Sequence, residues 1–425
     1  MYRQLIRHTG IQPLFQAIEM SILAACNDYP LHLHTEGLRG TGKTTVIRSA
    51  RHILPPITRI KGCIYNCHPA RPHCPLHRHL TAGAVRELGV ETVPRPFLEI
   101  SHSAKPGSIV GSIDLAKLTG KDGSVAALLP GTIPQAHRGI IFIDEINRLA
   151  DIAPELADIL LDVMGTKPGR IQIEEPGLPV IELPVSVSIW AASNPDEAPG
   201  PLRQIRRQLS DRFDLTVPVS KPATIHDVVG ILKNRRTAGC GPLPIPRFDY
   251  PPLEEIEVPD GIRSILAAIY INHQLESLRS IEAVEMAACL AALFDAQPRV
   301  TLDQISRVIP FALGHRTDSA TMAKISNYLD TLRYGDLLQT SHSATVPAQA
   351  DNRPPLKHRQ ETWRQKLWSL LSRTFRQTAP ADSPGKLPPH LSKSAEIIAP
   401  PDPAIPLSQL TDRQLITLPD CRSHD

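Results

Sequence analysis

A glycine-rich loop with a fixed spacing constrains the fold more than any other feature of this 425-residue sequence. The loop matches G-x-x-x-x-G-K-T, follows a short apolar run at 31–34 and opens a helical stretch at 46–50. Its glycines allow main-chain N–H groups to wrap phosphates, and the helix N-terminus adds positive potential. The predicted phosphate-binding residues are Gly37, Leu38, Arg39, Gly40, Thr41, Gly42, Lys43, Thr44 and Thr45.

Two carboxylates at the end of a second apolar run are the expected partners of this loop. The run Ile140–Ile143 is predicted to be a strand buried on both faces, and Asp144 and Glu145 follow it. Lys43 is expected to reach the β- and γ-phosphates, while the Thr44 hydroxyl and Asp144 hold Mg²⁺. Glu145 is expected to orient and deprotonate a water. The pattern predicts ATP hydrolysis, and the alternative is a strand that runs into a solvated turn.

A polar amide follows a third apolar run, at 187–192. Asn194 stands in the sequence Ser193-Asn194-Pro195, at the expected end of that strand. An amide in this position can hold the attacking water near the γ-phosphate, which makes Asn194 a candidate catalytic residue. The alternative is a plain Asn-Pro turn.

The order of apolar and helical segments predicts the domain organisation. A helix is expected at about 13–27. Apolar runs at 31–34, 97–100, 140–143 and 185–190 alternate with helical stretches from 31 to 220, which is typical of a parallel α/β sheet. A Pro/Gly-rich link at 239–246 precedes an all-helical stretch at 253–334. The predicted domains are a nucleotide-binding α/β domain at 1–238 with a Cys/His-rich insertion at 62–79, a helical lid at 239–335, and a Pro-rich, mostly disordered tail at 336–425 with a basic amphipathic helix at about 362–376.

Composition excludes several other classes of protein. The net charge is only +3 and aromatic residues make up 4% of the chain, so neither a strongly basic surface nor an aromatic base-stacking surface is expected, and no nucleic acid is expected as a partner. The sequence has no apolar stretch of about 18 residues and no signal-peptide core at its start. We therefore expect a cytoplasmic protein.

Three of the seven cysteines cluster within the insertion. Cys63, Cys67, Cys74 and His77 have the spacing C-x₃-C-x₆-C-x₂-H, which suits tetrahedral Zn²⁺ in a closed structural site. A [4Fe–4S] cluster is the rival cofactor, and free or redox-sensitive thiols are the alternative without a metal. Three further histidines of this segment are spare candidates for the fourth ligand: His68, His73 and His79.

Taken together, these motifs resemble those of the AAA+ ATPases, and specifically the I subunit of magnesium chelatase, over about residues 10–335. Besides the phosphate loop, Asp144-Glu145 and Asn194-Pro195, three further regions are similar to that family. Gly111–Leu115, Pro130–Ile133 and Ala136–Gly139 look like its insertion in helix 2 and the lead-in to the acidic strand. Leu209–Phe213 looks like its Leu-Leu-Asp-Arg-Phe element, and Ala312–Arg316 like the end of its helical domain. The resemblance implies a P-loop AAA+ parallel sheet flanked by helices, followed by an all-helical lid, and a ring, usually a hexamer, with ATP between neighbouring copies.

The resemblance also implies two arginines that act on nucleotide. Arg212 corresponds to the arginine finger, which stabilises charge on the phosphoryl group of the adjacent subunit's ATP. The alternative is an ion pair at the helix end with Asp211 or Asp214. Arg279 corresponds to a second, nucleotide-sensing arginine, and its alternative is a solvated residue at a helix start. Three nearby arginines compete with Arg212 for its role: Arg203, Arg206 and Arg207.

The function that the resemblance implies is ATP-driven insertion of Mg²⁺ into protoporphyrin IX. The expected partners are copies of the same chain, a D-type subunit with an integrin-like domain, and a large porphyrin-binding H-type subunit. This chain has no D-x-S-x-S motif, so the integrin-like domain is expected in a partner. The rival function is that of a MoxR-like AAA+ ATPase that remodels or metallates a different protein. A scaffold that does not turn over is disfavoured by Glu145 and Arg212.

Overall fold

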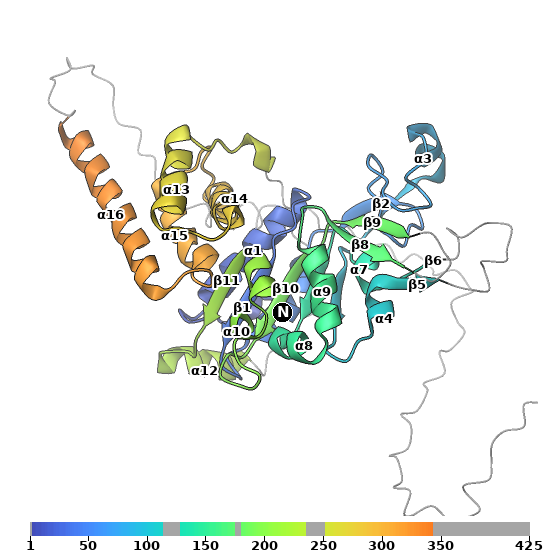
Figure 1. Cartoon of the computed structure of the whole chain (residues 1–425), viewed down its shortest axis with the longest axis horizontal. Helices are drawn as coiled ribbons and strands as arrows, with labels where there is room; N and C mark the ends of the chain where they lie inside the picture. The colour runs from blue at the N-terminus through green and yellow to red at the C-terminus, as the bar shows by residue number, and fades with distance from the viewer. Residues whose placement is uncertain (1, 114–127, 175–179, 235–250, 343–425) are drawn as a thin grey trace, which may run out of the picture. The chain divides into compact units, whose positions relative to one another are not determined.

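A five-stranded parallel sheet forms the centre of the computed structural model, which describes residues 2–113, 128–174, 180–234 and 251–342 (Figure 1). The strand order is β11-β1-β10-β7-β4, and each neighbouring pair is parallel. Because the strands are parallel, their carboxyl ends all meet at one edge. The strands are β1 (Leu33–Gly37), β4 (Phe97–Ile100), β7 (Ile140–Ile143), β10 (Ser188–Ser193) and β11 (Leu215–Val219).

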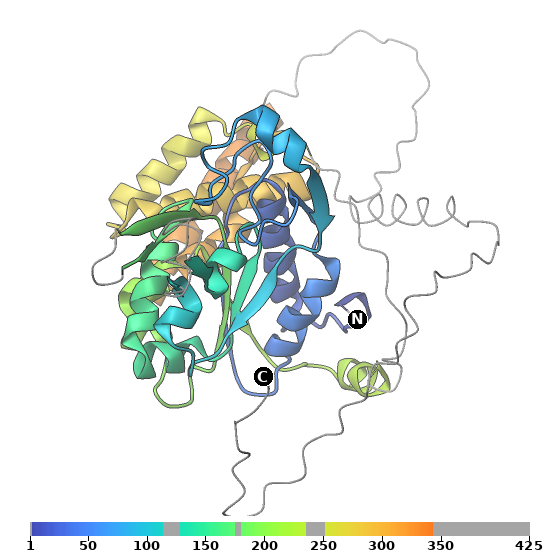
Figure 2. The same ribbon diagram turned by 90° about the vertical axis from the view of Figure 1, so that its right-hand side faces the viewer.

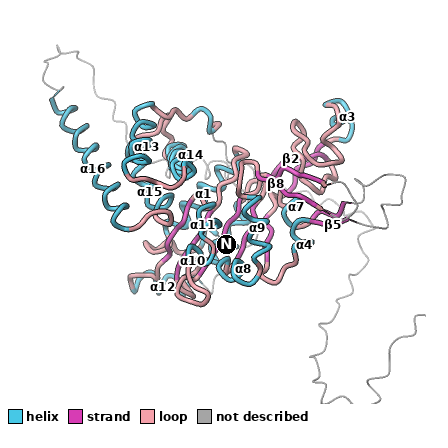
Figure 3. The backbone as a smooth tube through the Cα atoms, in the orientation of Figure 1, coloured by secondary structure: helices cyan, strands magenta, loops and turns pink. Residues whose placement is uncertain are grey.

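Three antiparallel ribbons extend from the connections of this sheet (Figure 3). The ribbon β5–β6 contains parts of the two stretches that resemble the family's helix-2 insertion. The pairs are β2 (Ile57–Ile60) with β3 (Val90–Val93), β5 (Gly111–Ile113) with β6 (Leu128–Pro130), and β8 (Gly169–Ile173) with β9 (Ile181–Val185).

Helices cover both faces of the sheet, and the strand residues alternate between the two cores (Figure 2). In β7, Ile140 and Phe142 belong to the core that contains α1 and α2, whereas Ile141 and Ile143 belong to the core that contains α8, α9 and α11. The helices of this region are α1 (Gln12–Cys26), α2 (Lys43–Ala50), α3 (Ala82–Leu88), α4 (Pro106–Val110), α7 (Thr132–Gln135), α8 (Ile146–Ile152), α9 (Pro154–Val163), α10 (Leu202–Ile205), α11 (Arg207–Arg212) and α12 (Ile225–Asn234).

Four further helices pack at the β11 side of the sheet. α14 contacts α1 and α15 contacts β11, so this helical region shares one apolar core with the sheet. Burial of this shared core, at roughly 25 cal/mol per Å² of apolar area, holds the helical region against the sheet. The helices are α13 (Asp260–Asn272), α14 (Leu278–Phe294), α15 (Leu302–Leu313) and α16 (Ser319–His342).

The elements agree with the expected order and differ in detail. The strands expected at 97–100 and 140–143 are β4 and β7, with the same bounds. The helix expected at 13–27 is α1. The run 185–190 is not one strand, because β9 ends at Val185 and β10 begins at Ser188. The helical region runs past the expected boundary at 335, since α16 ends at His342. The helix expected at 362–376 lies outside the described residues.

A buried ion pair ties the amino edge of the sheet together. The Lys167 Nζ donates to both carboxylate oxygens of Asp214, at 2.7 and 2.8 Å, and to the Tyr29 hydroxyl at 2.9 Å. The main-chain N–H of His32 donates to the same carboxylate at 2.7 Å. Burial opposes ionisation of Asp214, but Lys167 and the neighbouring donors hold the pKa of its carboxyl below the usual value. The pair thus joins the start of β1 to the start of β11 and to the α9–β8 connection.

The described helices include none with the length and apolarity that a membrane crossing requires.

We predict that Lys167→Met lowers the free energy of unfolding by about 3–5 kcal/mol, because it leaves the Asp214 carboxylate buried without its counter-ion. The measurement is urea unfolding followed by circular dichroism. The matched control is Arg170→Met, whose exposed pair with Glu182 is expected to contribute about 1 kcal/mol or less. Equal losses in the two variants would contradict the structural role of the buried pair.

Candidate functional site

The phosphate loop joins β1 to α2 at the carboxyl edge of the sheet. Gly40 and Gly42 have φ values of +78° and +89°, a backbone region that side chains other than glycine rarely adopt. Gly37 runs so close to β11 that a Cβ there would lie 2.3 Å from the main-chain oxygen of Val219. A Cβ at Gly40 would meet nothing within 4 Å, so the space beside this part of the loop is open. The loop therefore has the cradle that a polyphosphate requires.

The Lys43 side chain folds back onto the phosphate loop. Its Nζ donates to the main-chain oxygens of Gly37, at 2.5 Å, and Leu38, at 2.9 Å. Burial lowers the pKa of Lys43, and the nearby carboxylates of Asp144 and Glu197 oppose that shift. These carbonyl contacts hold the ammonium group at the loop, where a phosphate oxygen can replace a carbonyl as its acceptor.

The two expected Mg²⁺ ligands, Thr44 and Asp144, contact each other. The Thr44 hydroxyl, in the first turn of α2, donates to the Asp144 carboxylate at 3.4 Å. Asp144 follows β7 directly, and β10 separates β7 from β1 in the sheet. A hydroxyl and a carboxylate are oxygen ligands of the kind that Mg²⁺ prefers, so the donor set fits the metal.

An arginine that sequence reasoning missed lies beside this pair. Arg48 makes a bidentate contact with Glu99 of β4, at 2.9 and 3.1 Å, and approaches the Asp144 carboxylate at 3.8 Å. The only signal in the sequence is its position four residues after Thr44, on the same face of α2. Glu99 becomes its partner because β4 pairs with β7.

Glu145 begins α8 in a left-handed backbone conformation, with φ of 53°. Its carboxylate lies 3.1 Å from Arg148 and 4.0 Å from Arg39 of the phosphate loop, and its side chain is 37% exposed. The exposed position at the carboxyl edge leaves the carboxylate accessible to water. Arg39 also pairs with Glu197 at 2.8 Å, which links the loop to the segment after β10.

Asn194 follows β10 at the same edge of the sheet. Its side-chain oxygen accepts the main-chain N–H of Asp196 at 3.3 Å, and its main-chain oxygen accepts the Asn147 side chain at 3.3 Å. The side chain therefore closes the local turn that the sequence offered as the alternative. Because β10 lies between β1 and β7, Asn194 lies at the same edge as the phosphate loop and Asp144.

Arg212 and Arg279 meet at the opposite edge of the sheet. Both guanidinium groups donate to the main-chain oxygen of Gly165, Arg212 at 3.3 Å and Arg279 at 2.7 Å. Arg212 ends α11 just before β11, whose first residue pairs with the first residue of β1. The phosphate loop begins where β1 ends, at Gly37, about 13 Å along the strand from Leu33. The structure brings the two arginines together and places them away from their own phosphate loop.

The ion pairs proposed as the alternative for Arg212 do not form. Asp211 pairs with Arg316 at 2.9 Å, and Asp214 pairs with Lys167. Within the described residues, no carboxylate forms a salt bridge with Arg212. Burial lowers the pKa of Arg212, and the positive charge of Arg279 adds to that shift.

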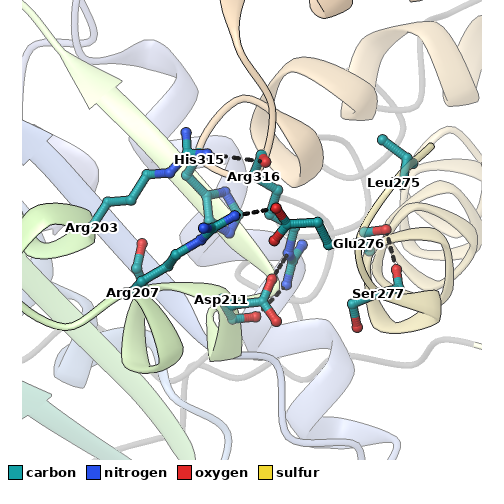
Figure 4. A pocket seen from close by; sticks show the side chains of 10 residues that line it. Arg203, Arg207, Asp211, Leu275, Glu276, Ser277, His315 and Arg316 are labelled. Atoms are coloured by element: carbon teal, nitrogen blue, oxygen red, sulfur yellow. Dashed lines mark hydrogen bonds and ion pairs between the residues drawn. The ribbon is translucent and has the colours of Figure 1, made fainter. Parts of the chain in front are cut away.

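The three competing arginines have other partners, and two of them, Arg203 and Arg207, line a pocket between the sheet region and the helical region (Figure 4). Arg206 pairs with Asp158 and Arg207 with Glu276, while Arg203 donates to main-chain oxygens of the α15–α16 connection. The pocket is lined by Arg203, Arg207, Ser210, Asp211, Leu275, Glu276, Ser277, Ser280, His315 and Arg316.

The predicted cysteine and histidine ligands converge. One ligand atom from each of Cys63, Cys67, Cys74 and His77 lies within 4.8 Å of all the others. Hydrogen bonds from the other two thiols lower the pKa of Cys63, and the hydrogen bond to Cys63 raises the pKa of both Cys67 and Cys74. The three thiols therefore lie close enough to change one another's ionisation.

The spare histidines do not join the ligand set. His73 Nδ1 lies 3.3 Å from the Cys67 sulfur, and its ring stacks on His137 at 3.7 Å between centroids. His68 Nδ1 accepts the N–H of Ala70, and His79 Nε2 accepts from Arg78. The geometry favours His77 as the fourth ligand.

Comparisons with known proteins agree with this arrangement. A family model described as magnesium chelatase, subunit ChlI, matches residues 15–198, and one described as AAA lid domain matches 263–330. The magnesium-chelatase 38 kDa subunit of Acidiphilium rubrum is 31% identical over 298 residues, which cover 66% of this chain and 81% of that protein. The 38 kDa subunit of Chlorobaculum tepidum is 28% identical over 310 residues, covering 66% and 72%.

A solved structure also aligns with the chain. It is a complex between the subunits BchI and BchD of magnesium chelatase, reconstructed by cryo-electron microscopy, with 24% identity and a TM-score of 0.41. The alignment covers 76% of this chain and 98% of the other.

The parallel sheet, the phosphate loop, the acidic end of β7 and the helical lid define a protein of the AAA+ class. Within that class, the chain belongs to the family of magnesium chelatase subunit I. Membership of this family implies an ATP and Mg²⁺ site.

We predict that Lys43→Ala weakens ATP binding about 10- to 160-fold, because a hydrogen bond to a charged group contributes about 1.5–3 kcal/mol. Isothermal titration calorimetry with ATP and Mg²⁺ measures the change. Lys324→Ala, an exposed lysine on α16, is the control and should bind like the unaltered chain. Unchanged affinity in Lys43→Ala would refute the assignment of the phosphate loop.

Proposed function

We propose that this chain is the ATP-hydrolysing motor subunit of a magnesium chelatase, which couples hydrolysis to insertion of Mg²⁺ into protoporphyrin IX. Membership of the subunit I family supports the class of reaction. One observation carries the mechanism: Lys43, Thr44, Asp144 and Glu145 lie at one edge of the sheet, while Arg212 and Arg279 lie together at the other. Each copy thus contributes two different halves of a catalytic pocket.

The first half of the pocket, at the carboxyl edge of the sheet, would bind nucleotide and activate the attacking water. Main-chain N–H groups of the loop and the Lys43 ammonium would hold the phosphates, with Thr44 and Asp144 as ligands of Mg²⁺. Bound Mg²⁺ supplies neutralisation of charge on the β- and γ-phosphate oxygens. Glu145 would accept a proton from the attacking water, because its carboxylate is exposed at the same edge. Asn194 would help to orient that water.

The second half of the pocket, formed by Arg212 and Arg279, would act on the nucleotide of a neighbouring copy. Arg212 lies too far along the strand to reach the phosphates bound by its own loop, so any action on nucleotide requires another subunit. A planar guanidinium supplied in this way stabilises the charge that develops on the transferring phosphoryl group. Arg279 donates to the same Gly165 oxygen, so we assign it to this trans half as well. A closed ring, with a hexamer as the expected size, completes every pocket.

Chelation itself is proposed to take place with partner subunits. Mg²⁺ gives up its hydration shell reluctantly, so insertion into a porphyrin is a reaction that ATP hydrolysis can assist. The partners proposed are a D-type subunit with an integrin-like domain and an H-type subunit that binds the porphyrin. The chain's own chemistry is ATP hydrolysis, and its coupling to insertion depends on those partners.

We predict that Arg212→Ala subunits poison rings formed with unaltered subunits. An arginine finger contributes about 10³–10⁵ to the rate of hydrolysis, so one altered copy disables its neighbour's pocket. ATPase rates are measured across a series of mixing ratios, with Arg207→Ala as the control from the same helix. Rings mixed from Arg212→Ala and Lys43→Ala subunits, each inactive alone, should regain hydrolysis at pockets where an unaltered loop meets an unaltered Arg212, and no regain would contradict action in trans.

The test of the proposed function is reconstituted Mg²⁺ insertion, followed by the fluorescence of the metalloporphyrin with and without ATP. The chain is combined with D-type and H-type subunits. Glu145→Gln is expected to bind ATP normally but to abolish turnover and insertion, because an amide cannot accept the proton of the attacking water. The control is Glu182→Gln on the β8–β9 ribbon, which should retain both activities.

The outcomes separate the proposed function from its rival. Insertion that requires ATP and Glu145 supports the chelatase motor. ATP hydrolysis that never couples to insertion, with any of the partners, would overturn it and favour a MoxR-like ATPase acting on a different protein.

A further inference from the structure

The segment 61–80 is irregular, yet it buries an unusual set of side chains. It contains no helix or strand, and its one isolated bridge joins His68 to Arg71. Even so, Cys63, Cys67 and Cys74 are each 2% exposed or less. Thiols are weak hydrogen-bond partners, and three of them facing one another contribute little that would order a loop of this kind. A cation held by these sulfurs would add the interaction that the thiols alone do not provide.

We propose that Cys63, Cys67, Cys74 and His77 bind a single Zn²⁺ ion in a closed structural site that fastens this segment to the approach to β7. The proposal concerns a site distinct from the nucleotide pocket, and it does not rest on the proposed function.

The spacing of the ligand atoms supports a single ion. All four lie within 4.8 Å of one another, and the Cys74 sulfur lies 3.2 Å from His77 Nδ1. A tetrahedral zinc with Zn–S bonds of about 2.3 Å places its sulfur ligands about 3.8 Å apart, which small side-chain rotations achieve here. A [4Fe–4S] cluster interposes irons and sulfides between its cysteine sulfurs and needs them further apart than one ion does. The geometry therefore favours zinc.

The surroundings of the sulfurs also suit a metal thiolate. The main-chain N–H groups of His73 and Cys74 both point at the Cys67 sulfur, at 3.4 and 3.3 Å. Such donors stabilise a thiolate and orient it towards a metal. Three thiolates, one Zn²⁺ and a neutral His77 leave one negative charge, and Arg138 interacts electrostatically with Cys67. The residual charge thus has a cationic neighbour.

Side chains of the cysteine segment contact residues just before β7, the strand that Asp144 follows. The His73 ring stacks on His137, which lies between α7 and β7. The Asn66 side chain donates to the main-chain oxygen of Gln135 at 2.7 Å, and the three cysteines share an apolar core with α7. Binding of zinc would hold the inserted segment against the amino end of β7. The ion has four protein ligands and no open position, so its role is structural.

The first test measures metal in the full-length chain, purified without added metal. Mass spectrometry of the elements should find about one zinc per chain and no iron or acid-labile sulfide. Cys67→Ser is expected to lose the zinc, whereas Cys26→Ser and His73→Asn should keep it, because neither residue is a ligand. Chain that binds no zinc, or that contains iron with sulfide, overturns the proposal.

A second measurement keeps the test decisive if Cys67→Ser fails to fold. Cobalt exchanged into the unaltered protein should show intense visible bands of a tetrahedral ion and thiolate-to-cobalt charge transfer. His77→Cys should retain the ion and strengthen the charge-transfer band by one thiolate. A weak octahedral spectrum in the unaltered protein, or a charge-transfer band unchanged by His77→Cys, would contradict the ligand set.

The structural role is tested by hydrogen exchange before and after zinc is removed with a chelator. Amides of residues 61–80 and of α7 should lose protection, while those of β1 and α2 should change little. Loss of zinc without any loss of protection in 61–80 would contradict the fastening role. None of these measurements uses ATP or a partner subunit, so their outcome is independent of whether the chain drives chelation.

Discussion

The common direction of the five strands is the constraint on which the rest of the molecule depends. Because the strands are parallel, every loop that leaves a carboxyl end meets the others at one edge, and this brings Lys43, Thr44 and Asp144 together. The same geometry sends the end of α11, with Arg212, to the other edge. One copy of the chain therefore presents the candidate nucleotide-binding groups on one side and the two arginines on the other, which is the arrangement that the proposed ring of identical subunits requires.

An ion pair and several hydrogen bonds hold the amino edge of the sheet together. Lys167 and Asp214 lock β1, β11 and the α9–β8 connection, and Gly165 of that connection accepts hydrogen bonds from both Arg212 and Arg279. Arg279 comes from the helical region, so this carbonyl is a point where the lid and the sheet region meet. A movement of the lid would change the position of Arg279 relative to Arg212. In the proposed ring, such a movement would reach the pocket of a neighbouring subunit.

The predictions from sequence succeeded where a local pattern fixes the structure. The four apolar residues 140–143 predict a strand buried on both sides, and the alternation between two cores confirms it. They failed where the structure depends on which strands pair with one another. β11, which contains Pro218, was not recognised as a strand, because its short run becomes regular only by pairing with β1. Arg48 was missed because its partner, Glu99, is brought to it by the pairing of β4 with β7.

The sequence alone determined the phosphate loop, the acidic end of β7, the order of the domains and the spacing of the cysteines. Each of these depends on neighbouring residues along the chain: backbone angles that only glycine adopts readily, apolar periodicity, and the short reach between ligands in one loop. Only the tertiary structure decided that Arg279 lies beside Arg212, that Asp211 and Asp214 have other partners, and that His77, not one of the spare histidines, lies within 4.8 Å of all three cysteine sulfurs. Those outcomes depend on which elements pack together, and packing depends on surfaces that no local stretch of sequence specifies.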